Sequence, residues 1–195
     1  MKTSEEVNHS DDQLLWEKMK VGNDHALGIL FKRHYPLLYN YGMKFSHQAE
    51  LVKDCIQEVF AYIWEKKHTV SHVSSVGAYL LTALRRQLLK SLEQQRKRHR
   101  ISQEYGKDYL ETMFSAEDLL IMNEEQDAVK NTLQTALHKI PSRMREALYL
   151  KMYSELSYKE IAVIMEIDSQ VARNYVSQAF HRLRGILALL ICLIY

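Results

Sequence analysis

The sequence predicts an all-α protein composed of two small helical domains joined by a flexible linker. Only 6 of the 195 residues are glycine and 2 are proline, which argues against a turn-rich β architecture. Apolar residues make up 47% of the chain and recur at helical spacing along most of it. Because this periodicity weakens in one stretch, we predict domains at residues 1–97 and 117–195, with residues 98–116 as the linker.

The first domain should open with two helices. Asp11 or Asp12 can cap the first of them, which is expected to end at Gly22. Asp24 can cap the second helix. Pro36 should kink that helix or mark a new first turn, because proline removes a backbone donor and crowds the preceding turn.

Two further helices and an ordered loop should complete the first domain. The spacing of apolar residues predicts a helix over residues 48–66, followed by a hydroxyl-rich loop at 68–75. Ser74 or Ser75 then caps a long helix that extends from residue 76 to about 97. The net charge of the chain is only +2, yet this long helix and its end carry a basic stripe. Its members are Arg85, Arg86, Lys90, Arg96, Lys97, Arg98 and Arg100.

The second domain should end in a helix-turn-helix. A helix lined by residues 129–140 precedes another that starts at Pro141 and Ser142. Ser157 and Glu160 have the spacing of a capping box, and residues 166–168 form the turn into a helix that begins at Ser169. Ala162 should lie where the two helices cross closely. The small shared core is expected to contain Ile161, Met165 and Ile167.

The outward face of the last helix carries side chains suited to DNA. If that helix enters the major groove, six residues would face the base edges, namely Ser169, Gln170, Arg173, Asn174, Ser177 and Gln178. Arginine matches guanine, whereas asparagine and glutamine match adenine. Lys159, Arg182 and Arg184 are better placed for phosphates. The alternative is an ordinary helical hairpin whose polar face is only solvated.

The order of these parts resembles the extracytoplasmic-function sigma factors, which join two helical domains by a flexible linker. The resemblance covers roughly residues 11–100 and 125–185. In that family the segment similar to residues 54–64 docks on the clamp helices of RNA polymerase. The resemblance therefore implies polymerase binding by Asp54, Gln57 and Glu58, while Phe60 and Trp64 pack inside.

The same resemblance assigns DNA contacts in both domains. The loop at 66–75 and the following helix occupy the place where the family melts the −10 element and captures an unstacked base. The residues implied for −10 binding are Thr69, Ser71, His72, Ser74, Tyr79, Arg85, Arg86 and Lys90. Residues 137–148 and 157–162 are similar to the −35 domain. The resemblance matches Arg173, Asn174, Ser177 and Gln178 to the base-facing positions of that domain. Together with the residues that helix geometry places beside them, the set expected for −35 binding is Lys159, Ser169, Gln170, Arg173, Asn174, Ser177, Gln178 and Arg182.

A few positions depart from the family pattern. Glu166 replaces the glycine often found in the turn, where a left-handed backbone would strain it. Ala172 replaces a buried valine and leaves a smaller core contact. In the promoter-melting helix, the usual arginine–asparagine pair is Arg85–Arg86, and Lys90 replaces an acid. These departures bear on base-by-base assignment more than on docking.

Several other functions lack a signal in the sequence. His68, His72 and Cys55 are too few and too scattered for a metal site, and no phosphate-binding loop or nucleophile elbow occurs. We therefore expect no catalytic activity, metal, cofactor or small-molecule substrate. The two cysteines form no disulfide framework and the first residues lack the apolar core of a secretory signal, which favours the cytoplasm.

The main functional hypothesis is a transcription initiation factor that binds core RNA polymerase and promoter DNA. One alternative is a sigma-like mimic that titrates an anti-sigma factor, and another is a stand-alone helix-turn-helix repressor. The resemblance also implies an inhibitory anti-sigma partner, which is membrane-linked in many cases. The apolar tail at residues 186–195 is too short to span a bilayer. Packing of the last helix is its favoured role, ahead of a protein interface or peripheral membrane contact.

Overall fold

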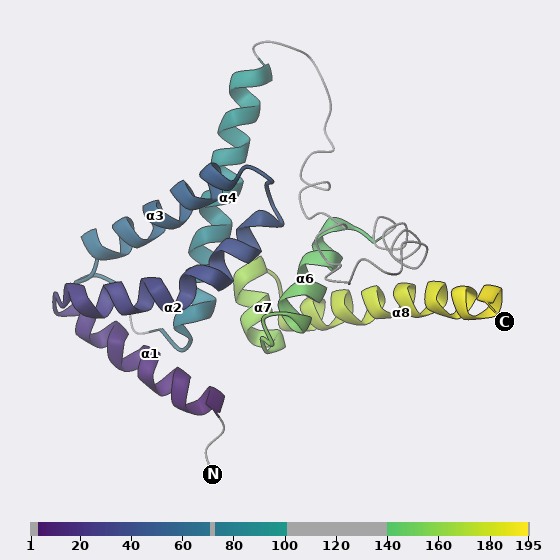
Figure 1. The fold of residues 1–195 in the computed structure, drawn as a ribbon, viewed down its shortest axis with the longest axis horizontal. Helices are drawn as coiled ribbons and strands as arrows, with labels where there is room; N and C mark the ends of the chain where they lie inside the picture. The colour runs from purple at the N-terminus through teal and green to yellow at the C-terminus, as the bar shows by residue number, and fades with distance from the viewer. Residues whose placement is uncertain (1–3, 71–72, 101–139, 195) are drawn as a thin grey trace. The chain divides into compact units, whose positions relative to one another are not determined.

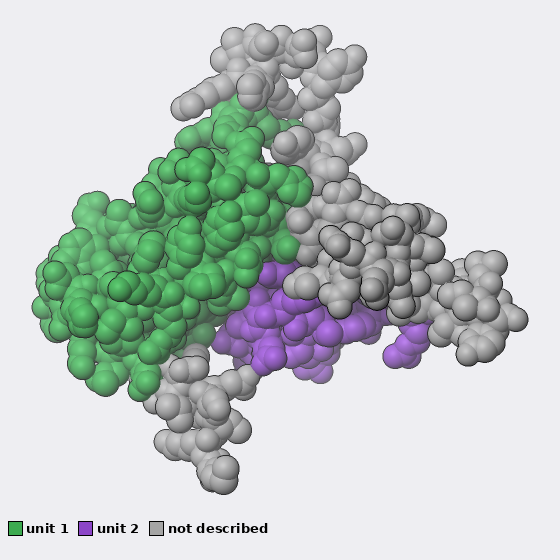
Figure 2. All heavy atoms as spheres, viewed as in Figure 1, with its two compact units in different colours: residues 1–104 green, residues 105–195 purple. Residues whose placement is uncertain are grey.

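The protein forms two compact units, residues 1–104 and 105–195, each described here by itself (Figure 2). The computed structural model describes residues 4–70, 73–100 and 140–194. All regular secondary structure in these ranges is α-helical, which confirms the predicted fold class (Figure 1). Most of the predicted linker lies outside the described residues, so its boundaries remain a prediction.

The first unit contains four described helices. They are α1 (Ser4–Lys20), α2 (Asp24–Met43), α3 (Ala49–Glu65) and α4 (Val76–Arg100). Helix α2 packs against the other three, and α4 also packs against α1 and α3. The largest fully buried side chains come from all four helices, and they include Trp16, Met19, Leu30, Leu38, Tyr41, Ile56, Ile63, Leu80, Leu81, Leu84 and Leu88. Burial of these apolar surfaces is the main force that assembles the unit.

The first helix begins earlier than its sequence signals predict. Neither Asp11 nor Asp12 caps it, because α1 already starts at Ser4 and Asp12 lies within it. The carboxylate of Asp12 is instead turned toward α2 and buried. The cap of α2 is also displaced by one residue, since Asn23 Oδ1 accepts the backbone N–H of Ala26 at 2.9 Å. Tertiary partners thus override the local preference of Asp12 for a cap.

Helix α2 continues past Pro36 and does not restart there. Near its end, α2 approaches α3 so closely that a Cβ atom at Gly42 would lie 2.5 Å from Val52 Cγ1. Only glycine fits at this crossing. Helix α3 confirms its predicted position and buries Val52, Cys55, Ile56, Val59, Phe60 and Ile63 along one face. Its opposite face is therefore left for solvent or a partner.

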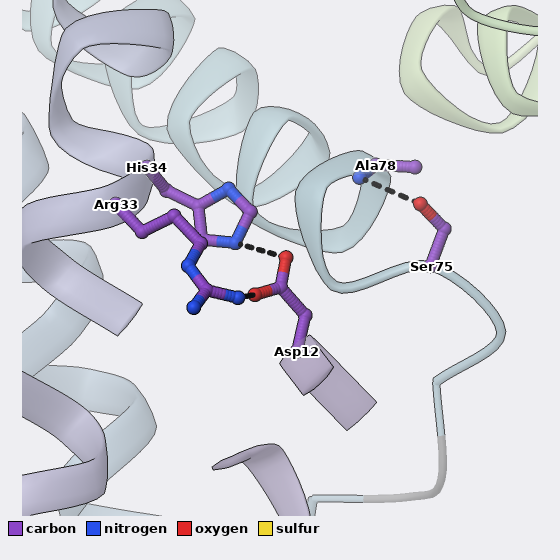
Figure 3. A network of polar contacts seen from close by, with 5 residues as sticks. All are labelled: Asp12, Arg33, His34, Ser75 and Ala78. Carbon is purple, nitrogen blue, oxygen red and sulfur yellow. Dashed lines mark hydrogen bonds and ion pairs between the residues drawn. The ribbon is translucent and has the colours of Figure 1, made fainter. Parts of the chain in front are cut away.

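The start of α4 is capped as predicted. Ser75 Oγ accepts the backbone N–H of Ala78 at 3.3 Å (Figure 3). Leu80, Leu84, Leu88 and Leu92 are buried in the spacing that the sequence indicates. The preceding loop is fastened at its other end, where Thr69 and Val70 donate their backbone N–H groups to the Lys66 carbonyl.

Asp12 forms a partly buried polar network between α1 and α2. Arg33 Nη1 lies 2.5 Å from Asp12 Oδ1, and His34 Nε2 lies 2.9 Å from Asp12 Oδ2 (Figure 3). Burial alone raises the pKa of the Asp12 carboxyl, but hydrogen bonds and positive charge from His34 and Arg33 outweigh it. The net result is a pKa below the usual value for aspartate.

We expect Asp12→Asn to lower the free energy of unfolding near pH 7 by on the order of 2 kcal/mol. Because the pKa of Asp12 is lower in the folded state, its contribution is complete above the unfolded-state pKa and is lost as pH falls through the folded-state pKa. Urea unfolding of both proteins at a series of acidic pH values should show the two curves converging. The exposed neighbour variant Asp11→Asn is the matched control, and parallel curves for Asp12→Asn would contradict the prediction.

The second unit contains three described helices, α6 (Ser142–Met152), α7 (Tyr158–Met165) and α8 (Ser169–Ile194). Both α6 and α7 pack against α8, and they also pack against each other. Helix α6 starts after Pro141, as predicted. Apart from Ile140, the helix expected over residues 129–140 lies outside the described residues.

The apolar tail belongs to the last part of α8. The backbone of this tail is helical as far as Ile194, whereas its side chains from residue 185 onward lie outside the description. Among the described helices, none is long and apolar enough to cross a membrane. Packing of the last helix therefore remains the predicted role of the tail, ahead of a protein interface or peripheral membrane contact.

Candidate nucleic-acid interface

The start of α7 is fixed by local hydrogen bonds. Ser157 Oγ accepts the backbone N–H of Glu160 at 3.3 Å, and Glu160 Oε2 accepts the backbone N–H of Ser157 at 2.9 Å. This reciprocal pair confirms the predicted capping box. Helix α7 ends at Met165, and the backbone of its C-cap residue, Glu166, is left-handed, with φ 55° and ψ 52°. Residues 166–168 then connect α7 to α8, which confirms the helix-turn-helix.

A small core fixes the angle between α7 and α8. Ile161 and Met165 of α7 are fully buried, and Ala162 is nearly so. On α8, Ala172, Val176 and Ala179 are buried in the same unit. Arg143 of α6 adds a polar tie, because its Nη2 donates to the Met165 carbonyl at 3.1 Å. The helix pair is thus a rigid support for whatever α8 presents on its outer face.

The left-handed backbone at Glu166 predicts that Glu166→Gly stabilises the second unit. A side chain in this conformation is strained, whereas glycine adopts it freely at the cost of a more flexible unfolded chain. We expect a net gain of about 1 kcal/mol in the free energy of unfolding, measured by urea denaturation. Glu166→Ala is the control that removes the carboxylate and keeps the strain; an equal gain from it would contradict the backbone explanation.

Five of the six predicted base-facing residues are exposed on α8. They are Gln170, Arg173, Asn174, Ser177 and Gln178, whereas Ser169 is half-buried. Their separations of three and four residues place them on one face. The predicted phosphate ligands Lys159, Arg182 and Arg184 are exposed as well. The structure therefore places the five exposed residues of α8 together on one polar face.

Three contacts restrain side chains on or beside this surface. The guanidinium carbon of Arg173 lies 5.3 Å from the ring centroid of Tyr158, the first residue of α7. Lys151 Nζ lies 5.1 Å from the same ring centroid. Gln170 Nε2 donates to Asn174 Oδ1 at 3.0 Å. Cation–π attraction thus restricts Arg173 before any DNA arrives.

The predicted polymerase-binding residues lie on the outer face of α3. Asp54, Gln57 and Glu58 are all exposed, and they fall within one turn of the helix. Glu58 Oε2 also accepts a hydrogen bond from Gln87 Nε2 of α4. Phe60 is buried as expected, whereas Trp64 is half-buried with Lys67 Nζ 4.3 Å from its ring centroid. This face offers acids and an amide to a basic partner.

The predicted −10 residues in the loop before α4 are described only in part. Thr69 is exposed and its Oγ1 donates to the Lys66 carbonyl at 2.9 Å. Ser74 is exposed, and its carbonyl accepts a hydrogen bond from Gln13 Nε2 at 3.2 Å. Ser71 and His72 lie outside the described residues. Their proposed contact with an unstacked base therefore remains a prediction.

The predicted −10 residues on α4 differ in how exposed their side chains are. Tyr79 is half-buried, and its ring meets Trp16 edge-on at 5.1 Å between centroids. Burial and, less strongly, Tyr62 raise the pKa of the Tyr79 hydroxyl, so it remains a neutral donor. Arg86 and Lys90 are exposed, whereas Arg85 is only 8% exposed. The surface available to DNA is thus narrower than the basic stripe in the sequence.

Sequence reasoning missed the contacts of four residues that support these surfaces, Asp12, Gln13, Trp16 and Tyr158. Trp16 follows Asp12 by four residues and precedes the buried Met19 by three, so helical periodicity could have indicated its place in the core. No comparable signal marks Tyr158, because its partner Arg173 lies on the next helix. In the part of the chain that the structure describes, no group of three or more metal-ligating side chains occurs.

Comparisons with known proteins identify the family. The family model "Sigma-70 region 2" matches residues 30–98, and "Sigma-70, region 4" matches residues 130–183. Together they span more than half of the chain. The chain is 25% identical over 149 residues to the ECF RNA polymerase sigma factor SigM of Bacillus subtilis, covering 76% of this chain and 87% of that one. It is 23% identical to the ECF sigma factor RpoE of Cereibacter sphaeroides, covering 85% and 91%.

Solved structures show the same fold. CnrH in complex with the cytosolic domain of CnrY matches with a TM-score of 0.62 and 16% identity, covering 91% of this chain and 97% of that chain. The sigma factor RpoE in complex with the anti-sigma factor NepR from Bartonella quintana matches with a TM-score of 0.55 and 21% identity, covering 83% and 96%. Regions 2 and 4 occur in the predicted order, and the predicted resemblance is confirmed. The chain belongs to the extracytoplasmic-function group of the sigma-70 family, non-enzymatic factors that direct RNA polymerase to promoters.

Proposed function

We propose that the two domains of this sigma factor divide the work of promoter recognition. Residues 1–97 dock on core RNA polymerase and contact the −10 element, residues 98–116 link the domains, and residues 117–195 bind the −35 element. The observation that carries the proposal is the single exposed face of α8, which bears Arg173, Asn174 and Gln178 on a packed helix-turn-helix. Such a face suits a helix that enters the major groove.

In this proposal α8 reads bases and its flanks bind phosphates. Arg173 is suited to a guanine edge through bidentate hydrogen bonds, and the amides of Gln170, Asn174 and Gln178 are suited to neighbouring bases. Ser169 and Ser177 add hydroxyl groups at the same face. Lys159 and Arg182 fix the register on the backbone without reading sequence.

The proposed polymerase contact is the outer face of α3, with Asp54, Gln57 and Glu58. Three polar side chains within one turn can pair with a basic partner surface. The proposed −10 contacts are the loop residues Thr69, Ser71, His72 and Ser74, together with Tyr79, Arg86 and Lys90. Arg85 is left out of this set because its side chain is buried. Aromatic and cationic groups in this combination suit single-stranded DNA.

We also propose an anti-sigma partner that is linked to the membrane, and action in the cytoplasm. Two structurally similar proteins, CnrH and the sigma factor RpoE, were solved with protein partners, which are the cytosolic domain of CnrY and the anti-sigma factor NepR. A sigma factor must meet core polymerase and chromosomal DNA, which places its action in the cytoplasm.

Run-off transcription with core polymerase on promoters of the same organism tests the proposal. We expect transcripts that depend on the chain and that become weaker when Arg173 or Glu58 is replaced by alanine. A chain that binds an anti-sigma factor but neither core polymerase nor DNA would be a mimic. Binding of a palindromic duplex as a dimer without polymerase would instead identify a repressor. Either result would overturn the proposed assignment.

A further inference from the structure

We infer that helix α1 is a brace that positions the start of α4 for contact with the −10 element. The brace consists of Asp12, Gln13 and Trp16, which lie before the residues 30–98 that match region 2. The inference deepens the proposed function, because the two residues that the brace contacts on the far side, Ser74 and Tyr79, are proposed DNA ligands.

One side of the brace is anchored in the core of the first unit. Asp12 pairs with Arg33 and with His34 on α2 (Figure 3). The His34 ring in turn faces the first turn of α4, since a Cβ atom at Gly77 would lie 3.6 Å from His34 Cε1. Trp16 and Met19, which lie on the same face of α1 as Asp12, are almost completely buried. Helix α1 is thus fixed relative to both α2 and α4.

The other side of the brace contacts the proposed DNA ligands. Gln13 Nε2 donates to the Ser74 carbonyl at 3.2 Å, just before the cap of α4. Three residues further along α1, Trp16 meets the Tyr79 ring edge-on, with an interplanar angle of 67°. Edge-to-face packing favours one orientation of the tyrosine ring. The hydrogen bond likewise restricts the backbone that carries the Ser74 hydroxyl.

These contacts remove freedom that DNA binding would otherwise have to remove. A ring and a backbone segment that are already oriented lose less entropy when an unstacked base arrives. Loss of the brace should therefore slow promoter opening. It should leave polymerase docking intact, because Asp54 and Glu58 belong to α3 and the brace acts on the start of α4.

The test uses the full-length protein with core polymerase on a promoter carrying 2-aminopurine in the −10 element. We expect Trp16→Leu combined with Gln13→Ala to slow the fluorescence change of opening by roughly fivefold to tenfold, measured well below the melting temperature of the variant. Affinity for fluorescently labelled core polymerase should stay within about twofold, as the docking face is unchanged. Trp16→Phe retains an aromatic edge and should restore most of the opening rate. Leu14→Ala, at an exposed position of the same helix, is the matched control.

Two results would overturn the brace. One is an unchanged opening rate in the double variant. The other is a parallel loss of opening and of core affinity that Trp16→Phe does not rescue, which is the pattern of a merely structural role. The variants Arg86→Ala and Lys90→Ala distinguish a failure of the brace from a failure of the proposed −10 contacts. If they open the promoter normally while the double variant is slow, the brace stands and the −10 assignment of these two residues fails.

Discussion

Replacing Arg173 by alanine should reduce discrimination at one base pair of the −35 element by roughly tenfold to a hundredfold, the range for loss of one bidentate arginine–base contact. The side chain is exposed on the outer face of α8 and is restrained by the Tyr158 ring. The measurement is holoenzyme binding to a set of promoters that differ singly across the −35 element, by fluorescence anisotropy at fixed salt. Affinity for the preferred sequence should fall toward that for its variants at one position only.

Two matched variants separate base reading from other effects. Arg182→Ala should weaken binding to every promoter by a similar factor and reduce its salt dependence, as expected for a lost phosphate contact. Tyr158→Leu should produce a smaller loss at the same base pair as Arg173→Ala, because it frees the guanidinium without removing it. If Arg173→Ala instead behaves like Arg182→Ala, the arginine binds phosphate and our groove assignment is wrong.

Reversing two charges on α3 should abolish sigma function at an earlier step. We expect Asp54→Lys combined with Glu58→Lys to weaken binding to core polymerase by more than about a hundredfold, because each lysine would meet the basic surface that the acids are proposed to contact. The measurement is titration of labelled protein with core enzyme. The isolated variant should keep nearly the same melting temperature, since both positions are exposed and, among the described residues, only the surface hydrogen bond from Gln87 to Glu58 is lost.

Glu17→Lys is the control for this charge reversal, because it changes charge at an exposed position of α1. It should leave core affinity close to that of the native chain. Equal weakening by the control would indicate a long-range effect of net charge and would remove the support for a docking face on α3. Unchanged affinity in the double variant would move the polymerase contact elsewhere.

The sequence predicts helix positions well where the signals are local. Apolar periodicity located α3 and α4, and the reciprocal spacing of Ser157 and Glu160 located the start of α7. Capping boxes and periodicity involve neighbours within one or two turns. They are therefore visible in the chain before any tertiary contact is known.

The start of α1 was predicted wrongly for a different reason. Asp12 is a good cap by type, but its partners Arg33 and His34 come from another helix, so the chain alone does not reveal them. The burial of Arg85 was more accessible to sequence reasoning. It follows the buried Leu81 by four residues and precedes the buried Leu88 by three, so helical geometry assigns it to the apolar face.

The candidate site could be predicted as a set of residues but not as a set of oriented groups. Periodicity identified the outward face of α8. It gave no indication that Tyr158 restrains Arg173, or that Gln170 is bonded to Asn174. Such pairings depend on how helices cross and on side-chain rotamers, which a linear pattern does not encode.

Two buried alanines, Ala162 on α7 and Ala172 on α8, bear on protein engineering, because these helices pack against each other. Small side chains in a helix–helix contact allow the axes to approach closely, and we expect this approach to set the tilt at which α8 leaves the turn. A relative with a bulkier residue at either position would present the same outward side chains at another height and angle. Transfer of recognition residues between such proteins should therefore fail unless the two alanines are transferred as well. Promoter preference then depends on the contact between α7 and α8 as much as on the exposed face of α8.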